Sequence, residues 1–220
     1  MNGHLAVAMV TETLRRVLGD ALSTAGPGGV GSAQVTTMRP SSLTTVDAQA
    51  SGVNVFLYRA APRGAPGLDM LPTRRSGARM VAPATQCLEL DYLLTFYGDE
   101  STLEPQRLLG TTVATLARHP VLDRELVADV AARAVLVNPD AWEQHHDPAA
   151  APDAVRLSML PLDQEAATKL WSALFHSAYR LSVAYQATTV FVTDEDPAHT
   201  PAKKPKKVHI TADPSTEGGR

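Results

Sequence analysis

The stretch LELDYLLTFYGDE, residues 88–100, decides the fold because its side chains differ in character with a period of two. That period puts successive side chains on opposite faces, as in a β-strand. One face is expected to be apolar, and its residues are Leu88, Leu90, Tyr92, Leu94 and Phe96. At about 3.3 Å of rise per residue, the stretch is predicted to be a long strand that anchors a sheet.

Two acids, Glu89 and Asp91, lie on the opposite face of this strand and raise the question of catalysis. Their Cβ atoms are expected roughly 7 Å apart, a separation that glycosidase carboxylates can have. Those carboxylates, however, usually come from different elements and lie in a cleft. The residues that share this face are Cys87, Leu93, Thr95 and Tyr97. We therefore favour a solvated or partner-facing sheet surface over a catalytic pair.

Helical and strand patterns alternate along the rest of the chain. Apolar residues at helical spacing predict helices over 5–24, from Ser101 or Thr102 to His119, over 123–134, and from Asp163 to about Leu174. Period-two and β-branched patterns predict strands near 34–37 and over 51–59, 155–160 and 182–193. This order predicts an α/β or α+β fold, a mixed sheet of four to five strands with helices packed on it.

Capping signals and composition predict where elements and domains end. Ser101 and Glu104 have capping-box spacing, Pro105 suits a first helical turn, and Asp163 can cap the last helix. The segments 60–83 and 138–154 are rich in proline and small residues and are predicted to be long loops. We expect one domain over residues 1–193 and a flexible tail over 194–220.

The composition is that of an ordinary globular protein, with 220 residues, 44% hydrophobic and 20% charged. Cys87 is the one cysteine, which excludes an intrachain disulfide and a cysteine-based zinc site, and we expect it to be packed and inert. No apolar run approaches the ~18 residues of a membrane span. Residues 1–20 lack the basic start of a secretory signal, so a cytoplasmic protein is expected.

Two further motifs are weak. Gly26, Gly28 and Gly31 match G-x-G-x-x-G, but the predicted helix precedes them and the strand follows, which reverses the order of a dinucleotide site. His145, His146 and Asp147 are adjacent in a loop, and adjacent residues rarely ligate one ion. We interpret the first as a turn and the second as a surface loop, and predict neither a metal nor a cofactor.

The last 20 residues hold four of the five lysines, Lys203, Lys204, Lys206 and Lys207. Such a cluster is typical of nuclear-localisation or nucleic-acid patches. Without interleaved aromatic residues, its phosphate binding would be weak and salt-sensitive. A solubilising tail, or a docking arm for an acidic partner, is the favoured interpretation. Val208, His209 and Ile210 could add a brief strand to a neighbouring sheet.

Several segments taken together resemble one known family. They are Phe96-Tyr97-Gly98 at the end of the long strand, QRLLG over 106–110, Leu170-Trp171-Ser172, and SVAY over 182–185. With their surroundings, over about residues 5–193, they resemble the cap, or tail-terminator, protein of contractile injection systems. The chain is similar in particular to the N-terminal domain of the cap of Photorhabdus virulence cassette particles.

The resemblance implies a structural protein without catalysis or cofactor. Such caps form a six-fold ring that ends the inner tube and the contractile sheath at the end distal to the baseplate. The partners implied are a homo-hexamer, the tube protein and the sheath protein, with no membrane and no nucleic acid. Particle assembly is expected in the cytoplasm.

Three alternatives stay open at this point. The chain could be a tail-completion protein at another joint of a phage-like particle. It could be a weak nucleic-acid or anion-binding module that acts through its lysine tail. Last comes an enzyme that uses Glu89, Asp91 and His145 or His146.

Overall fold

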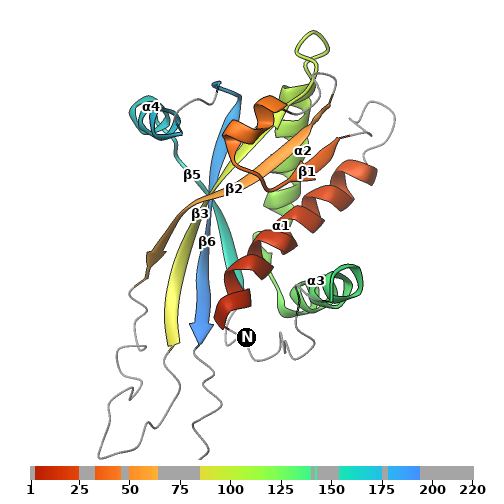
Figure 1. Cartoon of the computed structure of the whole chain (residues 1–220), viewed down its shortest axis with the longest axis vertical. Helices are drawn as coiled ribbons and strands as arrows, with labels where there is room; N and C mark the ends of the chain where they lie inside the picture. The colour runs from red at the N-terminus through yellow and green to blue at the C-terminus, as the bar shows by residue number, and fades with distance from the viewer. Residues whose placement is uncertain are drawn as a thin grey trace, which may run out of the picture.

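The computed structural model describes residues 3–24, 33–45, 50–63, 85–139, 142, 154–174 and 178–193. These residues form one twisted, six-stranded mixed sheet with four α-helices packed on it (Figure 1). The predicted mixed α/β class is therefore confirmed. The sheet has one strand more than the four to five expected.

The strands are β1 (Gln34–Thr36), β2 (Gly52–Pro62), β3 (Thr85–Tyr97), β4 (Val121–Leu122), β5 (Val155–Leu160) and β6 (Ser182–Thr193). The helices are α1 (Gly3–Thr24), α2 (Glu104–Arg118), α3 (Arg124–Val137) and α4 (Gln164–Ala173), with a 3-10 helix η1 at Pro40–Thr45. The spatial order of the strands is β1-β2-β3-β6-β5-β4. The β1–β2 pair is parallel and the other pairs are antiparallel.

β3 lies at the centre of the sheet, as its alternating pattern predicts, and is 13 residues long. Opposite residues in an antiparallel pair share a face, and Phe96 pairs with Val53, Leu94 with Val55, and Tyr92 with Leu57. The expected apolar face of β3 and the apolar face of β2 therefore form one continuous surface of the sheet. Register shifts interrupt the β2–β3 pairing near Tyr58 and the β3–β6 pairing near Glu89.

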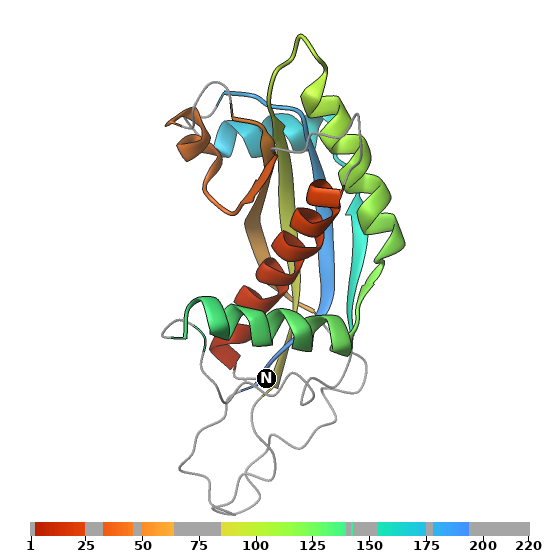
Figure 2. The ribbon, with the colours of Figure 1, turned by 90° about the vertical axis from the view of Figure 1, so that its right-hand side faces the viewer.

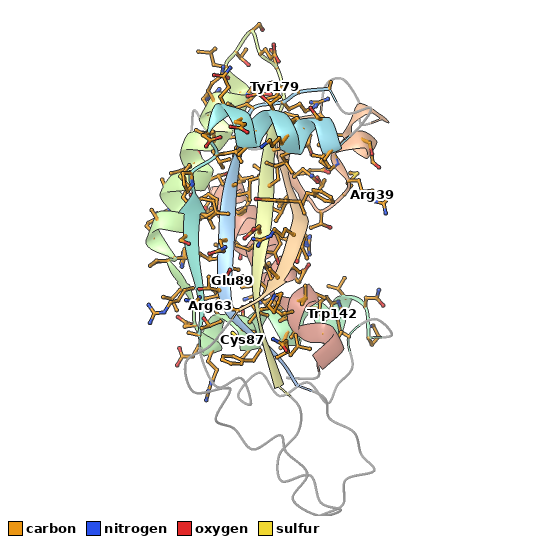
Figure 3. The ribbon with its side chains drawn as sticks, turned by 90° about the vertical axis from the view of Figure 1, so that its left-hand side faces the viewer. Arg39, Arg63, Cys87, Glu89, Trp142 and Tyr179 are labelled. Carbon is orange, nitrogen blue, oxygen red and sulfur yellow. The ribbon has the colours of Figure 1, made fainter. Side chains whose placement is uncertain are left out.

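The helices cover the two faces of the sheet unequally. Figure 2 shows α1, α2 and α3 in front of one face, which we call the α1 face, and Figure 3 shows α4 across one end of the other, which we call the second face. The core lies between α1 and β3, where Leu14, Leu18 and Phe96 are buried. The hydroxyl groups of Thr11 and Tyr92 lie 2.9 Å apart across this interface.

The start of α2 differs from the prediction. Ser101 does not form a capping box, because its backbone N–H and its hydroxyl both donate to Asp99 Oδ1, at 2.8 and 2.7 Å. Glu104 instead accepts the backbone N–H of Asp99 at 2.8 Å. The N-cap is Leu103, which is left-handed with φ 56° and makes no side-chain cap hydrogen bond. Pro105 lies in the first turn as expected.

Other boundaries agree with the sequence or extend it. The Asp163 carboxylate accepts the Ala166 N–H at 2.7 Å, which confirms the predicted cap. The predicted loop over 60–83 begins too early, since β2 continues to Pro62. β4 was missed because two residues, Val121 and Leu122, are too short to display a period. Cys87 is buried as expected.

Several predicted features fall outside the described residues. They are the glycine motif at Gly26–Gly31, the bulk of the loop over 60–83, the triplet His145-His146-Asp147 and the tail over 194–220. Within the described ranges, no helix is long and apolar enough to cross a membrane.

Candidate partner-binding face of the sheet

The second face carries the two acids that the sequence singles out. Strand pairing places Arg59, Asp91 and Gln186 side by side on it, from β2, β3 and β6. Figure 3 looks onto this face, with α4 across one end and the labelled Glu89, Arg63 and Cys87 toward the other. The part of the face around Glu89 is not crossed by a described helix.

Asp91 is the centre of a polar row across three strands. Asp91 is 3% exposed, and both oxygens of its carboxylate accept hydrogen bonds. Arg59 Nη1 donates to Oδ2 at 2.7 Å, and Gln186 Nε2 donates to Oδ1 at 2.9 Å. A buried carboxylate needs such donors, because an unpaired charge away from water is strongly unfavourable. The carboxylate is thus held rigidly by neighbours within the chain.

Arg59 places the positive charge of this row at the surface of the protein. Its side chain is 56% exposed, so the guanidinium edge that does not face Asp91 meets solvent. The hydrogen bond with Asp91, followed by the charge of Asp91, raises the pKa of the Arg59 guanidinium. Burial, and then the Asp91 charge, raise the pKa of the neighbouring Tyr58. The row therefore offers a fixed cation on the sheet surface.

Glu89 is in a different environment from Asp91. Its side chain is 27% exposed and lies 3.6 Å from Arg63 Nε, measured from Glu89 Oε1. A partly solvated ion pair of this kind contributes little to stability, typically below about 1 kcal/mol. Glu89 is thus the accessible acid of the two. Asp91 is not solvated within a single chain, contrary to the solvated interpretation of this face.

The arrangement favours recognition over acid–base chemistry. Each acid faces an arginine from β2 or its end and forms an ion pair with it. A surface hollow of about 390 Å³ lies elsewhere, between the end of β3, α2 and Tyr179-Arg180. Neither Glu89 nor Asp91 lines it. A role of these two residues in contacting a partner stays a prediction.

Arg59 and Gln186 are site residues that the sequence did not reveal. Each is a polar residue in a strand whose residues are mostly apolar or β-branched. The signal that identifies them is register, and β2 is joined to β3 by a long segment instead of a tight turn that would fix the pairing. Only the paired strands show that they meet Asp91.

Comparison with known proteins gives a family and a fold. The sequence profile of the Pvc16 N-terminal domain matches residues 9–204. No curated protein matches the chain. The sheath/tube terminator of the extracellular contractile injection system PVC, in its extended state, is 14% identical, with a TM-score of 0.50 over 97% of this chain. The tube-terminating cap of the anti-feeding prophage is also 14% identical, with a TM-score of 0.46 over 92% of this chain.

Both solved relatives are longer proteins. The chain spans 64% of the length of the PVC terminator and 59% of that of the anti-feeding prophage cap. The likeness to the PVC terminator concerns the fold. The profile match, by contrast, extends over most of the sequence, and it shows that the chain belongs to the Pvc16 N-terminal domain family.

Proposed function

We propose that this chain is a structural cap of a phage-tail-like contractile injection system, which terminates the inner tube and the contractile sheath at the end distal to the baseplate. The observation that carries the proposal is the fold, shared over 97% of the chain with a protein described as a sheath/tube terminator. Membership of the Pvc16 N-terminal domain family supports the same role. The particle is assembled in the cytoplasm, and the cap acts without catalysis.

The proposed assembly is a homo-hexameric ring in contact with the tube protein and the sheath protein. A ring of identical subunits closes through head-to-tail interfaces, in which two different surfaces of each copy meet. The sheet supports this arrangement because its two faces differ. α1, α2 and α3 cover the α1 face, whereas α4 crosses an end of the second face (Figures 2 and 3).

The second face is the surface that we assign to a partner within this assembly. Arg59 and Arg63 supply exposed cationic groups, and Glu89 supplies an accessible carboxylate. Charges of both signs fixed in one register favour one docking geometry over others, more than they add affinity. The lysines of the tail, Lys203, Lys204, Lys206 and Lys207, are proposed as a second contact with an acidic partner.

Deletion of the reading frame tests the cap role. Particles from the deletion strain should contain tubes and sheaths of irregular length, because nothing fixes where polymerisation ends. Lengths are measured in negatively stained electron micrographs, with the intact gene supplied in trans as the control. An unchanged, narrow length distribution in the deletion strain would contradict the proposal.

A further inference from the structure

The sheet leaves a short edge open on β5. β4 pairs only with Val155 and Arg156, and Leu157 N–H donates to Pro120 O at 2.8 Å. Beyond that point, no strand among the described residues pairs with the outer edge of 158–160. Met159 lies on this edge and is 52% exposed. An unpaired edge strand is a template to which another strand can add.

Among the described strands, the opposite edge of the sheet is also partly unpaired, but several features oppose the addition of a strand there. β1 covers only Gly52–Asn54 of β2, and the outer edge of β2 continues to Pro62. A register shift between Leu57 and Arg59 distorts this edge, and the proline lacks a donor. The exposed Arg59 would also repel a cationic strand. The β5 edge has none of these features over 158–160.

The chain itself contains a segment that fits the β5 edge. Val208, His209 and Ile210 alternate apolar, polar and apolar, with β-branched residues at both ends, and directly follow the lysine cluster. We propose that residues 208–210 of a neighbouring copy pair antiparallel with residues 158–160 of β5. This inference rests on the ring of the proposed function and names the contact that links one copy to the next.

Charge selects the antiparallel direction. With His209 opposite Met159, the preceding lysines lie toward the turn after β5 and the start of α4, where Asp163 and Glu165 are exposed. Glu165 forms an ion pair with Lys169, but the two side chains are 76% and 74% exposed, so this pair holds Glu165 weakly. Parallel pairing would instead place the lysines toward Arg156, a like charge.

Chain direction favours a neighbour over the same copy. β6 ends at Thr193, which pairs with Thr85, whereas the open edge lies beside residues 184–186 of β6. Figure 1 shows β6 ending at the lower end of the molecule and β5 leading up to α4. Residues 194–207 span at most about 50 Å when extended, so residues 208–210 can lie up to that distance from the end of β6. β6 thus ends at the far end of the sheet from the open edge of the same copy.

Disulfide trapping in assembled particles tests this pairing. The full chain carries Met159→Cys and His209→Cys, and particles purified from the producing strain are oxidised and separated on a non-reducing gel. The expected result is a shift of the chain from the monomer band to a ladder of linked multimers. The matched control, Ala60→Cys with His209→Cys, probes the β2 edge and should stay monomeric, as should each single variant. Replacing the four lysines by glutamine should lower the yield of the ladder.

The outcomes separate this inference from the cap role. A ladder with the 159/209 pair, and none with 60/209, supports the pairing. Particles that contain the chain but give no ladder, an equal ladder from both pairs, or only an internal link within one copy would overturn the inference and leave the cap role standing. Absence of the chain from particles would overturn both.

Discussion

At the residue scale, the second face depends on a single buried carboxylate. Asp91 is nearly inaccessible, yet it is bonded to an exposed arginine on one side and to an amide on the other. Hydrogen bonds to a charged group contribute more than those between neutral groups, about 1.5–3 kcal/mol each. The row therefore fixes the position of Arg59 relative to β3. Glu89, two residues from Asp91, is not held by such a row of hydrogen bonds.

Truncation of the two acids should separate these environments. Asp91→Ala removes both hydrogen bonds of the row. Because the exposed Arg59 is resolvated when its partner is lost, the expected decrease in the free energy of unfolding is about 2 kcal/mol, less than two full charged hydrogen bonds. Glu89→Ala, on the same face of the same strand, should cost less than about 0.5 kcal/mol because its ion pair is partly solvated. Urea unfolding followed by circular dichroism measures both. Equal losses for the two variants would show that the row does not hold Asp91 as described.

Tyr92 gives the fold a predictable response to alkali. Burial raises the pKa of its phenol to about 12, and the hydrogen bond with Thr11 opposes this only in part. Unfolded tyrosine ionises near pH 10, so between about pH 10 and 12 the unfolded state has released more protons and is favoured as pH rises. The stabilisation of the fold that comes from the protonated Tyr92 phenol is constant below that pH window and is lost as pH rises through it.

Tyr92→Phe should therefore flatten the decline of stability in alkali. The variant removes the titrating group, while Tyr58 and Tyr185, whose pKa values burial also raises, remain. The free energy of unfolding should fall less steeply above pH 10 in the variant than in the parent chain. Identical slopes in urea titrations at a series of pH values would mean that Tyr92 is not the buried phenol that resists ionisation.

At the element scale, one glycine permits the parallel pairing of β1 with β2. Gly52 lies opposite Gln34, and an added Cβ would lie 2.2 Å from the Gln34 carbonyl oxygen and 2.6 Å from the Tyr97 hydroxyl. Since the first contact is with backbone, no side-chain rotation relieves it. β1 can pair with β2 at the sheet edge only because Gly52 has no side chain.

Gly52→Ala is accordingly expected to destabilise the chain by about 2 kcal/mol or more. Gly110→Ala is the matched control, because a Cβ at Gly110 in α2 would meet nothing within 4 Å. In the middle of a helix that substitution should stabilise by roughly 0.5–1 kcal/mol. Thermal unfolding of both variants measures the two opposite shifts. A neutral Gly52→Ala would contradict the close β1–β2 approach.

The elements also show which parts of the fold the sequence could predict. β3 was identifiable because its period of two extends over many residues, and the helices because their apolar residues recur at helical spacing. The start of α2 was predicted wrongly, since the Ser101 hydroxyl bonds to Asp99 in the preceding turn. A local sequence pattern cannot show which of several nearby hydrogen-bonding groups a hydroxyl will bond to.

The candidate site was predictable only in part for a different reason. Glu89 and Asp91 could be assigned to one face from their spacing alone. Burial of Asp91 depends on what packs beside it, and Arg59 and Gln186 become its neighbours through strand pairing over long sequence separations. Periodicity contains no information on that pairing.

At the scale of the whole molecule, the two faces and the two edges of the sheet are all different. α1, α2 and α3 cover the α1 face, and the second face presents Arg59 and Glu89. β1 and β4 each protect only part of the strand beside them. Such asymmetry suits a subunit that offers different surfaces to a like copy, to a tube and to a sheath. Periodicity alone did not predict an assembly; the family resemblance did.

The position of the chain in intact particles is the decisive measurement of its role as a cap. Electron cryo-microscopy of particles from the parent and deletion strains gives the difference density that belongs to this protein. If the chain is the cap, a six-fold ring of difference density is expected at the end distal to the baseplate, in contact with both tube and sheath. Difference density along the shaft or at the baseplate, or none at all, would contradict that role.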